Sequence, residues 1–146
     1  MKTSDKGIRF ITSEEGLILH PYLDSVKKPT IGYGSTYHED GTPVKMTDKP
    51  ITKEKALQLF STTLKQYEGA INQVITRPIG QNQFDALVSL CYNIGTERFK
   101  GSTVAKKVQA NPQDPDIKKW FEAWKNAGGK PILLARRTRE SNLYFS

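Results

Sequence analysis

The feature that most restricts the possible fold is a change of sequence pattern near Pro50. Before this point, residues 17–45 hold short β-branched and aromatic stretches separated by turn-forming residues, as in the segment 27–34, KKPTIGYG. This pattern is typical of short antiparallel strands. After it, apolar side chains such as Leu57 and Phe60 recur every three or four residues, which is the spacing of amphipathic helices. The sequence therefore predicts an α+β fold in which a small antiparallel sheet accompanies a mostly helical region.

Helices are predicted both before and after that sheet in the chain. A short helix precedes it at residues 4–15, and the later helices are expected around residues 57–71, at 81–94, after Ser102, from Asp114 to Gly128, and at 132–143. With 146 residues the chain has the length of one domain. Within residues 1–146 we expect a sheet-rich lobe at about 13–50 and a helical lobe made of 1–12 and 51–146. A ligand site is expected in a cleft between two such lobes.

Composition excludes several classes of protein. No stretch approaches the roughly 18 consecutive apolar residues that a membrane-spanning helix requires. The opening segment MKTSDK leads into no apolar run, so we expect no secretory signal. The single cysteine, Cys91, forms neither an internal disulfide nor a zinc cluster, and a buried thiol is expected. Because His20 and His38 are isolated in the sequence, we expect no metal site, and no cofactor is implied.

The charge is unevenly distributed along the chain. Residues 1–97 hold 11 basic and 11 acidic side chains, whereas residues 98–139 hold 11 basic and 3 acidic ones, a net charge of +8. Such asymmetry indicates an anionic partner, which could be nucleic acid, a membrane surface or an acidic polymer. A basic nucleic-acid-binding domain is therefore one hypothesis for the function, supported by the run RRTR at 136–139.

Two carboxylates in the first part of the chain suggest a second hypothesis. Glu15 lies at the C-terminal end of the first predicted helix, where the helix dipole should raise the pKa of a carboxyl group. Asp24 lies in the turn-rich strand region that follows. Two carboxyl groups in unlike environments are the machinery of glycoside hydrolysis. Considered by themselves, however, these residues also fit ordinary surface carboxylates.

Three motifs surround these carboxylates: EGL at 15–17, YLD at 22–24 and PTIGYG at 29–34. Together they resemble the active-site segment of the lysozymes of tailed bacteriophages, glycoside hydrolase family 24, and among them those of short-tailed enterobacterial phages. In that family a Glu, an Asp and a Thr stand nine and then six residues apart, as Glu15, Asp24 and Thr30 do. The resemblance covers about residues 8–145, because further similar motifs follow in the family's order: NQFDAL at 82–87, YNIG at 92–95, GST at 101–103, WKNAGG at 124–129 and RRTRE at 136–140.

The resemblance implies a lysozyme-like fold and a role for each of the three residues. Glu15 would be the general acid that protonates the glycosidic oxygen. Asp24 and Thr30 would hold and activate a water on the opposite face of the sugar. The family inverts the anomeric configuration, which implies carboxyl groups about 6.5–9.5 Å apart. Without the resemblance, Thr30 would be read as an ordinary β-branched strand residue.

The resemblance also implies substrate-binding residues and a biological role. Tyr92 and Asn93 correspond to positions that contact sugars, and Arg136 or Arg137 to an arginine that pairs with the catalytic Glu; we assign Arg137 to substrate binding. The implied function is that of a phage endolysin, which cleaves the β-1,4 bond between N-acetylmuramic acid and N-acetylglucosamine in peptidoglycan.

Such an enzyme is expected to act as a monomer. It would stay in the host cytoplasm until a separate holin gives it access to the wall. A lytic transglycosylase is the enzymatic alternative, and the Asp24 and Thr30 pair argues against it because that reaction uses no nucleophilic water.

Overall fold

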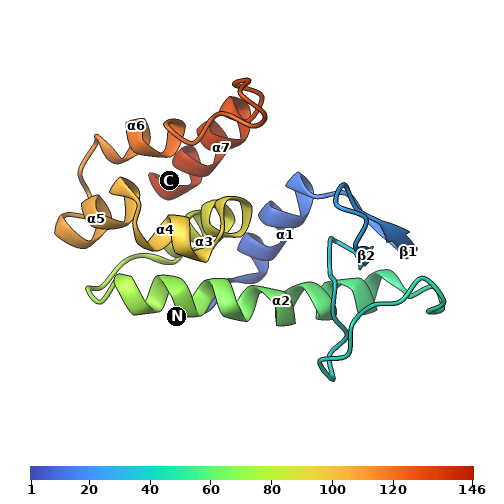
Figure 1. Cartoon of the computed structure of the whole chain (residues 1–146). Helices are drawn as coiled ribbons and strands as arrows, with labels where there is room; N and C mark the ends of the chain where they lie inside the picture. Colours follow the sequence, from blue (N-terminus) through green and yellow to red (C-terminus); the bar gives the residue numbers. More distant parts are fainter. The chain divides into compact units, whose positions relative to one another are not determined.

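The computed structural model describes all 146 residues and contains seven helices and two strands (Figure 1). Their bounds in chain order are α1 (Asp5–Glu14), β1 (Ile18–Leu23), β2 (Pro29–Gly32), α2 (Lys53–Val74), α3 (Gln81–Ile94), α4 (Thr96–Lys100), α5 (Thr103–Ala110), α6 (Ile117–Glu122) and α7 (Leu134–Tyr144). The chain divides into two compact units. The sheet unit is Arg9–Lys65, and the helical unit is made of Met1–Ile8 and Gln66–Ser146.

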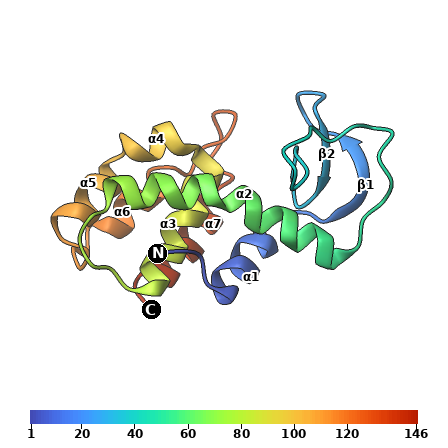
Figure 2. The same cartoon turned by 90° about the horizontal axis from the view of Figure 1, so that it is seen from below.

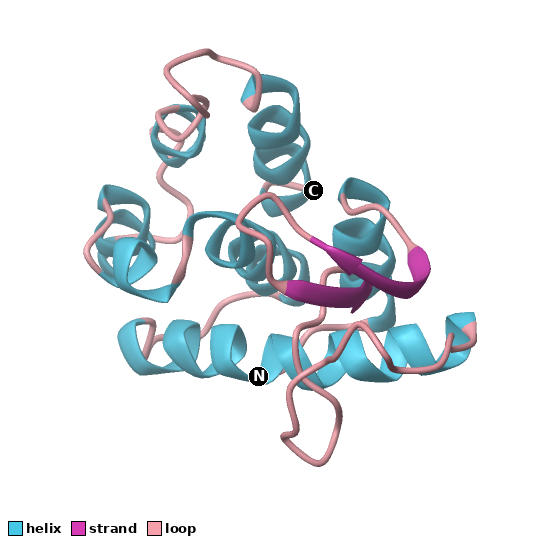
Figure 3. Cartoon of the chain, turned by 45° about the vertical axis from the view of Figure 1, so that its right-hand side comes forward, coloured by secondary structure: helices cyan, strands magenta, loops and turns pink.

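The sheet unit is built on one short hairpin, drawn in magenta in Figure 3. Strands β1 and β2 pair antiparallel, with Tyr22 opposite Thr30, and the pairing is irregular between Ile18 and Tyr22. On the buried side, Ile31 packs in a small apolar cluster that also contains Val44 and Leu59. The β-branched side chain of Ile31 is fully enclosed there, which stabilises the strand through burial rather than through a long hydrogen-bonded ladder.

The first half of α2 belongs to this sheet unit and closes its core. The ring of Phe60 packs edge-on against Tyr33, with their centroids 5.8 Å apart. At Gly32, whose φ is +71°, an added Cβ would lie 3.2 Å from the Cβ of Ala56, so the strand approaches the helix closely. The unit is therefore wider than the lobe at 13–50 that the sequence suggested, because residues of α2 supply part of its core.

The helical unit is centred on α3, which packs mainly against α7 (Figures 1 and 2). Nine consecutive residues of α3, Gln83–Cys91, are buried, as expected for a helix enclosed on all sides. The thiol of Cys91 is among them, and burial raises its pKa to about 12. The predicted buried cysteine is thus confirmed, and at neutral pH it is a protonated, weakly reactive thiol.

Most predicted elements are confirmed, including the small antiparallel sheet and the helix at 81–94. The helix predicted from Asp114 to Gly128 is wrong in its bounds, because α6 occupies only Ile117–Glu122. The side chain of Asp114 accepts the backbone N–H of Asp116 at 2.9 Å, so it stabilises a turn before the helix instead of capping the helix. Helix α4, directly after Gly95, was not predicted. None of the helices has the length and apolar character needed to cross a bilayer.

Candidate active site

Glu15 immediately follows the last residue of α1. Its backbone N–H bonds to the carbonyl of Thr12 at 3.1 Å, so the chain still turns helically there before bending away. The side chain is half-buried. The last turn of α1 contains no basic residue, so no lysine or arginine of that turn offsets the partial negative charge of its carbonyls. A carboxyl group at this point lies at the negative end of the helix, as the sequence predicted.

Asp24 follows β1 and shapes the turn that leads into β2. Its Oδ1 accepts the backbone N–H groups of Val26 at 2.9 Å and of Lys28 at 2.8 Å. The backbone closes the same turn, because Asp24 N–H donates to the carbonyl of Lys28 at 3.0 Å and Lys27 adopts a left-handed φ of +61°. Two bonds to one oxygen fix the orientation of the carboxylate. The other oxygen, Oδ2, accepts no hydrogen bond from the protein.

Thr30 lies on β2 with its side chain almost wholly buried, at 3% exposure. Its hydroxyl donates to the carbonyl oxygen of Lys28 at 2.8 Å. The hydroxyl proton is therefore engaged in this hydrogen bond, and the lone pairs of Oγ1 remain available to accept others. Residue Lys28 thus contacts both predicted site residues through its backbone: its N–H holds Asp24 and its carbonyl holds Thr30.

Tyr22 lies within electrostatic range of both Asp24 and Glu15. Burial raises the pKa of the Tyr22 phenol most, and the negative charges of Asp24 and then Glu15 raise it further. Both carboxylates are therefore near enough to the phenol to act on it electrostatically. Neither Tyr22 nor Lys28 is predicted from the sequence to belong to the site. Tyr22 lies opposite Thr30 across the hairpin, and its place in the motif YLD, two residues before Asp24, is the sequence signal that could have found it.

The predicted substrate-binding residues Tyr92, Asn93 and Arg137 lie in the helical unit. Tyr92 is half-buried near the end of α3, and its ring packs edge-on against Tyr67 with their centroids 5.1 Å apart. Asn93 is exposed on the same helix, and its Oδ1 accepts a hydrogen bond from Nη2 of Arg137.

Arg137 is fully enclosed, contrary to a role in direct contact with a sugar. Its Nε donates to the carbonyl of Trp124 at 2.9 Å, and Nη1 pairs with Glu140. The three ends of the guanidinium are thus taken by groups of its own unit, which include Asn93. Arg136 is also buried and lies 3.3 Å from the same Glu140 carboxylate. Both arginines therefore pair with Glu140 within the helical unit. The pairing of Arg136 or Arg137 with Glu15 stays a prediction.

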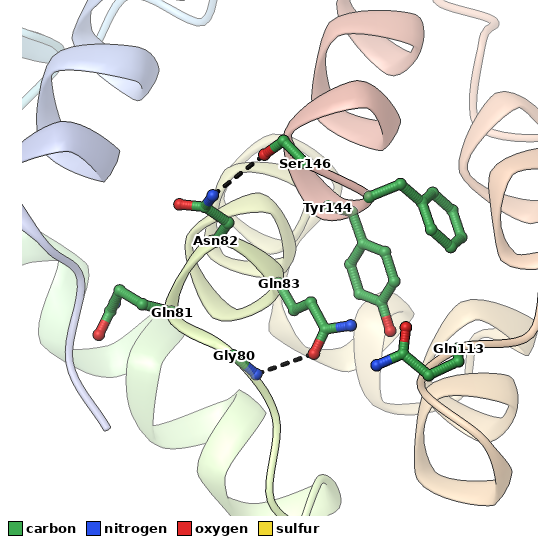
Figure 4. A pocket seen from close by; sticks show the side chains of 8 residues that line it. Gly80, Gln81, Asn82, Gln83, Gln113, Tyr144 and Ser146 are labelled. Carbon is green, nitrogen blue, oxygen red and sulfur yellow. Dashed lines mark hydrogen bonds between the residues drawn. The ribbon is translucent and has the colours of Figure 1, made fainter.

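Two further observations concern other possible sites. A pocket of about 440 Å³ in the helical unit lies between the start of α3 and the end of α7 (Figure 4). Its lining side chains are all neutral and include none of the predicted catalytic residues; they are Gln81, Asn82, Gln83, Gln113, Tyr144, Phe145 and Ser146, with Gly80. No three His, Cys, Asp or Glu side chains gather in a way that could hold a metal ion.

Comparison with known proteins identifies the family. The family model described as phage lysozyme matches residues 12–140. The endolysin of Salmonella phage P22 is 42% identical over 147 residues, covering 100% of this chain and 99% of that protein. The crystal structure of a mutant P22 lysozyme superposes with a TM-score of 0.91 at 42% identity, covering 100% of this chain and 99% of that one. The muramidase domain of SpmX from Asticaccaulis excentricus has a TM-score of 0.80 at 32% identity, with 99% and 98% covered. The chain belongs to the phage lysozyme family.

Proposed function

We propose that this chain is an endolysin that hydrolyses the β-1,4 bond between N-acetylmuramic acid and N-acetylglucosamine in peptidoglycan. Its membership of the phage lysozyme family supports the class of reaction. The observation that carries the mechanism is the backbone of Lys28, which holds the Asp24 carboxylate and the Thr30 hydroxyl through bonds of 2.8 Å each. The backbone of one residue thereby holds both acceptors.

The two acceptors suit a water nucleophile. Asp24 Oδ2 accepts no hydrogen bond from a protein donor. The hydroxyl of Thr30 already donates its hydrogen bond to the carbonyl of Lys28, so its oxygen is left to act as an acceptor. A water that donates one proton to each oxygen keeps a lone pair free to attack the anomeric carbon. As the bond to carbon forms, Asp24 takes the proton that the water loses, and Glu15 donates its own proton to the departing glycosidic oxygen. Attack opposite the leaving group inverts the anomeric centre.

Substrate binding on the helical unit would use Asn93 and Tyr92. Asn93 is exposed, and its carboxamide is oriented by the bond from Arg137. With its oxygen engaged, the amide nitrogen is the group left to donate to a sugar hydroxyl or N-acetyl oxygen. In this proposal Arg137 is a positioning residue that acts through Asn93, and it does not touch the sugar itself.

The biological role proposed is lysis of the bacterial host at the end of infection. The protein would act as a monomer on glycan strands, and would wait in the host cytoplasm until a separate holin opens the inner membrane. Expression without a holin should then leave cells intact until chloroform is added. Spontaneous lysis, with the protein found in the periplasm, would contradict the dependence on a holin.

The catalytic assignment is tested with matched pairs of variants on purified peptidoglycan. Glu15→Gln should abolish hydrolysis, since glutamine has no acidic proton, whereas the adjacent Glu14→Gln should keep most of the activity. Asp24→Asn should lower turnover roughly 10²-fold or more. Asp40→Asn is its control, because Asp40 also accepts a backbone N–H in a turn of the sheet unit, from Thr42 at 3.0 Å. An active Glu15→Gln with an inactive Glu14→Gln would overturn the assignment.

Product analysis tests the reaction type. Mass spectrometry of the released muropeptides should show a reducing muramic acid end, and NMR of the first product should show the α-anomer. A 1,6-anhydro end would identify a lytic transglycosylase. A β-anomer would show retention and would remove Asp24 from the role of general base.

A further inference from the structure

The loop that joins α6 to α7 exposes two large aliphatic side chains. We call residues 125–134 the α6–α7 loop; its last residue is the first of α7. Ile132 is 69% exposed and Leu134 is 42% exposed. Two large aliphatic side chains that are exposed two residues apart are a candidate contact surface.

The loop is an ordered, hydrogen-bonded structure. Ala127 and Lys130 bond to each other through both backbone pairs, at 2.8 and 3.1 Å. Gly128 and Gly129 between them have φ of +59° and +78°, the left-handed values of a tight two-residue turn. The base of the loop is closed where Leu133 N–H donates to the carbonyl of Lys125 at 2.9 Å. This network brings the two ends of the loop together and fixes the backbone that presents the apolar residues.

The base is also anchored to the interior of the helical unit. Arg137 donates through Nε to the carbonyl of Trp124, the residue just before the loop, at 2.9 Å. Arg137 itself is fully enclosed and pairs with the buried Glu140. The loop is therefore anchored to the buried interior of its unit. Because it is already ordered, it loses less conformational entropy when it binds a surface.

The segment that carries the apolar pair has charged side chains of one sign. Residues 123–139 contain no Asp or Glu, and the loop holds two exposed lysines, Lys125 and Lys130, neither of which forms an ion pair. Lys125 lies where the loop closes, and the N–H of Ile132 donates to the carbonyl of Lys130 at 2.9 Å. The lysines are thus connected through the backbone to the segment that exposes Ile132 and Leu134.

We propose that the α6–α7 loop docks on the surface of a lipid bilayer that contains anionic phospholipid. Ile132 and Leu134 enter the boundary between headgroups and acyl chains, and Lys125 and Lys130 face the lipid phosphates. A polyanion such as nucleic acid or an acidic glycan would pair with the charges of the lysines, but it would not bury the aliphatic side chains. A bilayer with anionic headgroups satisfies both, because shallow burial of apolar side chains and attraction between lysines and phosphates add up at that surface.

Sedimentation with lipid vesicles tests this inference without any cleavage of peptidoglycan. The full chain should bind vesicles of phosphatidylcholine mixed with phosphatidylglycerol and bind pure phosphatidylcholine far more weakly. The double variant Ile132→Ser, Leu134→Ser should reduce binding to the mixed vesicles by about tenfold or more. The double variant Lys125→Gln, Lys130→Gln should reduce it by about tenfold or more at low salt, and increasing salt should weaken the unmodified chain.

A matched control comes from the sheet unit. Met46 is 48% exposed and stands beside Lys45, so Met46→Ser removes a comparable apolar side chain next to a basic one. This variant should bind the mixed vesicles as the unmodified chain does. All variants should keep their melting temperature and their rate of hydrolysis on purified sacculi, which contain no bilayer.

Three results would overturn the inference. The first is equal binding to neutral and mixed vesicles. The second is unchanged binding of the Ile132→Ser, Leu134→Ser variant while the lysine variant fails, which would identify the loop as a general polyanion contact. The third is an equal loss with Met46→Ser, which would mean that any exposed apolar side chain contributes. A failure of vesicle binding with normal hydrolysis would leave the proposed enzymatic function untouched.

Discussion

Replacing Glu140 with glutamine should strongly destabilise the helical unit. The Glu140 carboxylate is fully enclosed and accepts a hydrogen bond from the hydroxyl of Ser89 at 2.5 Å. It also accepts Nε of Arg136 at 3.3 Å and pairs with Nη1 of Arg137. One carboxylate therefore pairs with two buried guanidiniums, and both lose its negative charge when it becomes a neutral amide.

The size of the loss follows from this geometry. Glutamine keeps the shape of the side chain, so no cavity forms and the charge alone is removed. Breaking a buried ion pair from one side typically costs about 3–5 kcal/mol, since the remaining charge stays buried without compensation. For a chain of this length, each kcal/mol lowers the melting temperature by about 2–4 °C. The expected decrease is therefore roughly 6–20 °C.

Thermal and urea unfolding followed by circular dichroism would measure this loss. Glu122→Gln is the matched control, because Glu122 is a half-buried glutamate on α6 of the same unit with no ion pair. The control should stay within about 0.5 kcal/mol of the unmodified chain. If Glu140→Gln loses less than about 1 kcal/mol, ion pairing does not hold this interior together and the reasoning is refuted.

Three other outcomes are expected. Gly7→Ala should lower the free energy of unfolding by about 1–3 kcal/mol in urea titrations, because an added Cβ would lie 2.5 Å from Cγ of the buried Asp85; unchanged stability would contradict this. Hydrogen bonds from the Lys45 backbone and then from His38 lower the pKa of Asp48, so Asp48→Asn should be less stable than the unmodified chain near neutral pH. That difference should shrink in urea titrations as the pH falls below about 4, where the unmodified chain loses the contribution. Lys106→Glu should slow hydrolysis of whole sacculi at low salt more than cleavage of a short neutral oligosaccharide, and equal slowing would exclude a docking role for this charge.

The three predicted catalytic residues could be found from sequence because they lie within one short stretch. Glu15, Asp24 and Thr30 belong to a helix end and a single hairpin, so their separation in the chain largely determines their separation in space. A spacing of nine and then six residues is informative for such a local structure. Their catalytic roles are still predictions, which the variants above test.

The surroundings of Arg137 could not be found in the same way. Its partners are Glu140 three residues later, the carbonyl of Trp124, and Asn93, which is 44 residues earlier. The run RRTRE is strongly polar, and polarity in a helix normally indicates a solvent-exposed face. Only the packing of α7 against α3 shows that two arginines and the glutamate are enclosed. Long-range burial of paired charges leaves no periodic signal in the sequence.

Lys28 contributes to the candidate site through its backbone and not through its side chain. Such a contribution cannot be recognised from the type of residue at the position. Its N–H and carbonyl position Asp24 and Thr30. Its side chain instead makes a cation–π contact, with Nζ 5.2 Å from the ring centroid of Tyr37. Any residue except proline can supply that N–H, so the position tolerates many side chains without loss of geometry. What the site requires at this point is the path of the backbone. That path depends on the left-handed turn at Lys27 and on the two bonds to Asp24 Oδ1, so the carboxylate that would activate water also folds the loop that holds it.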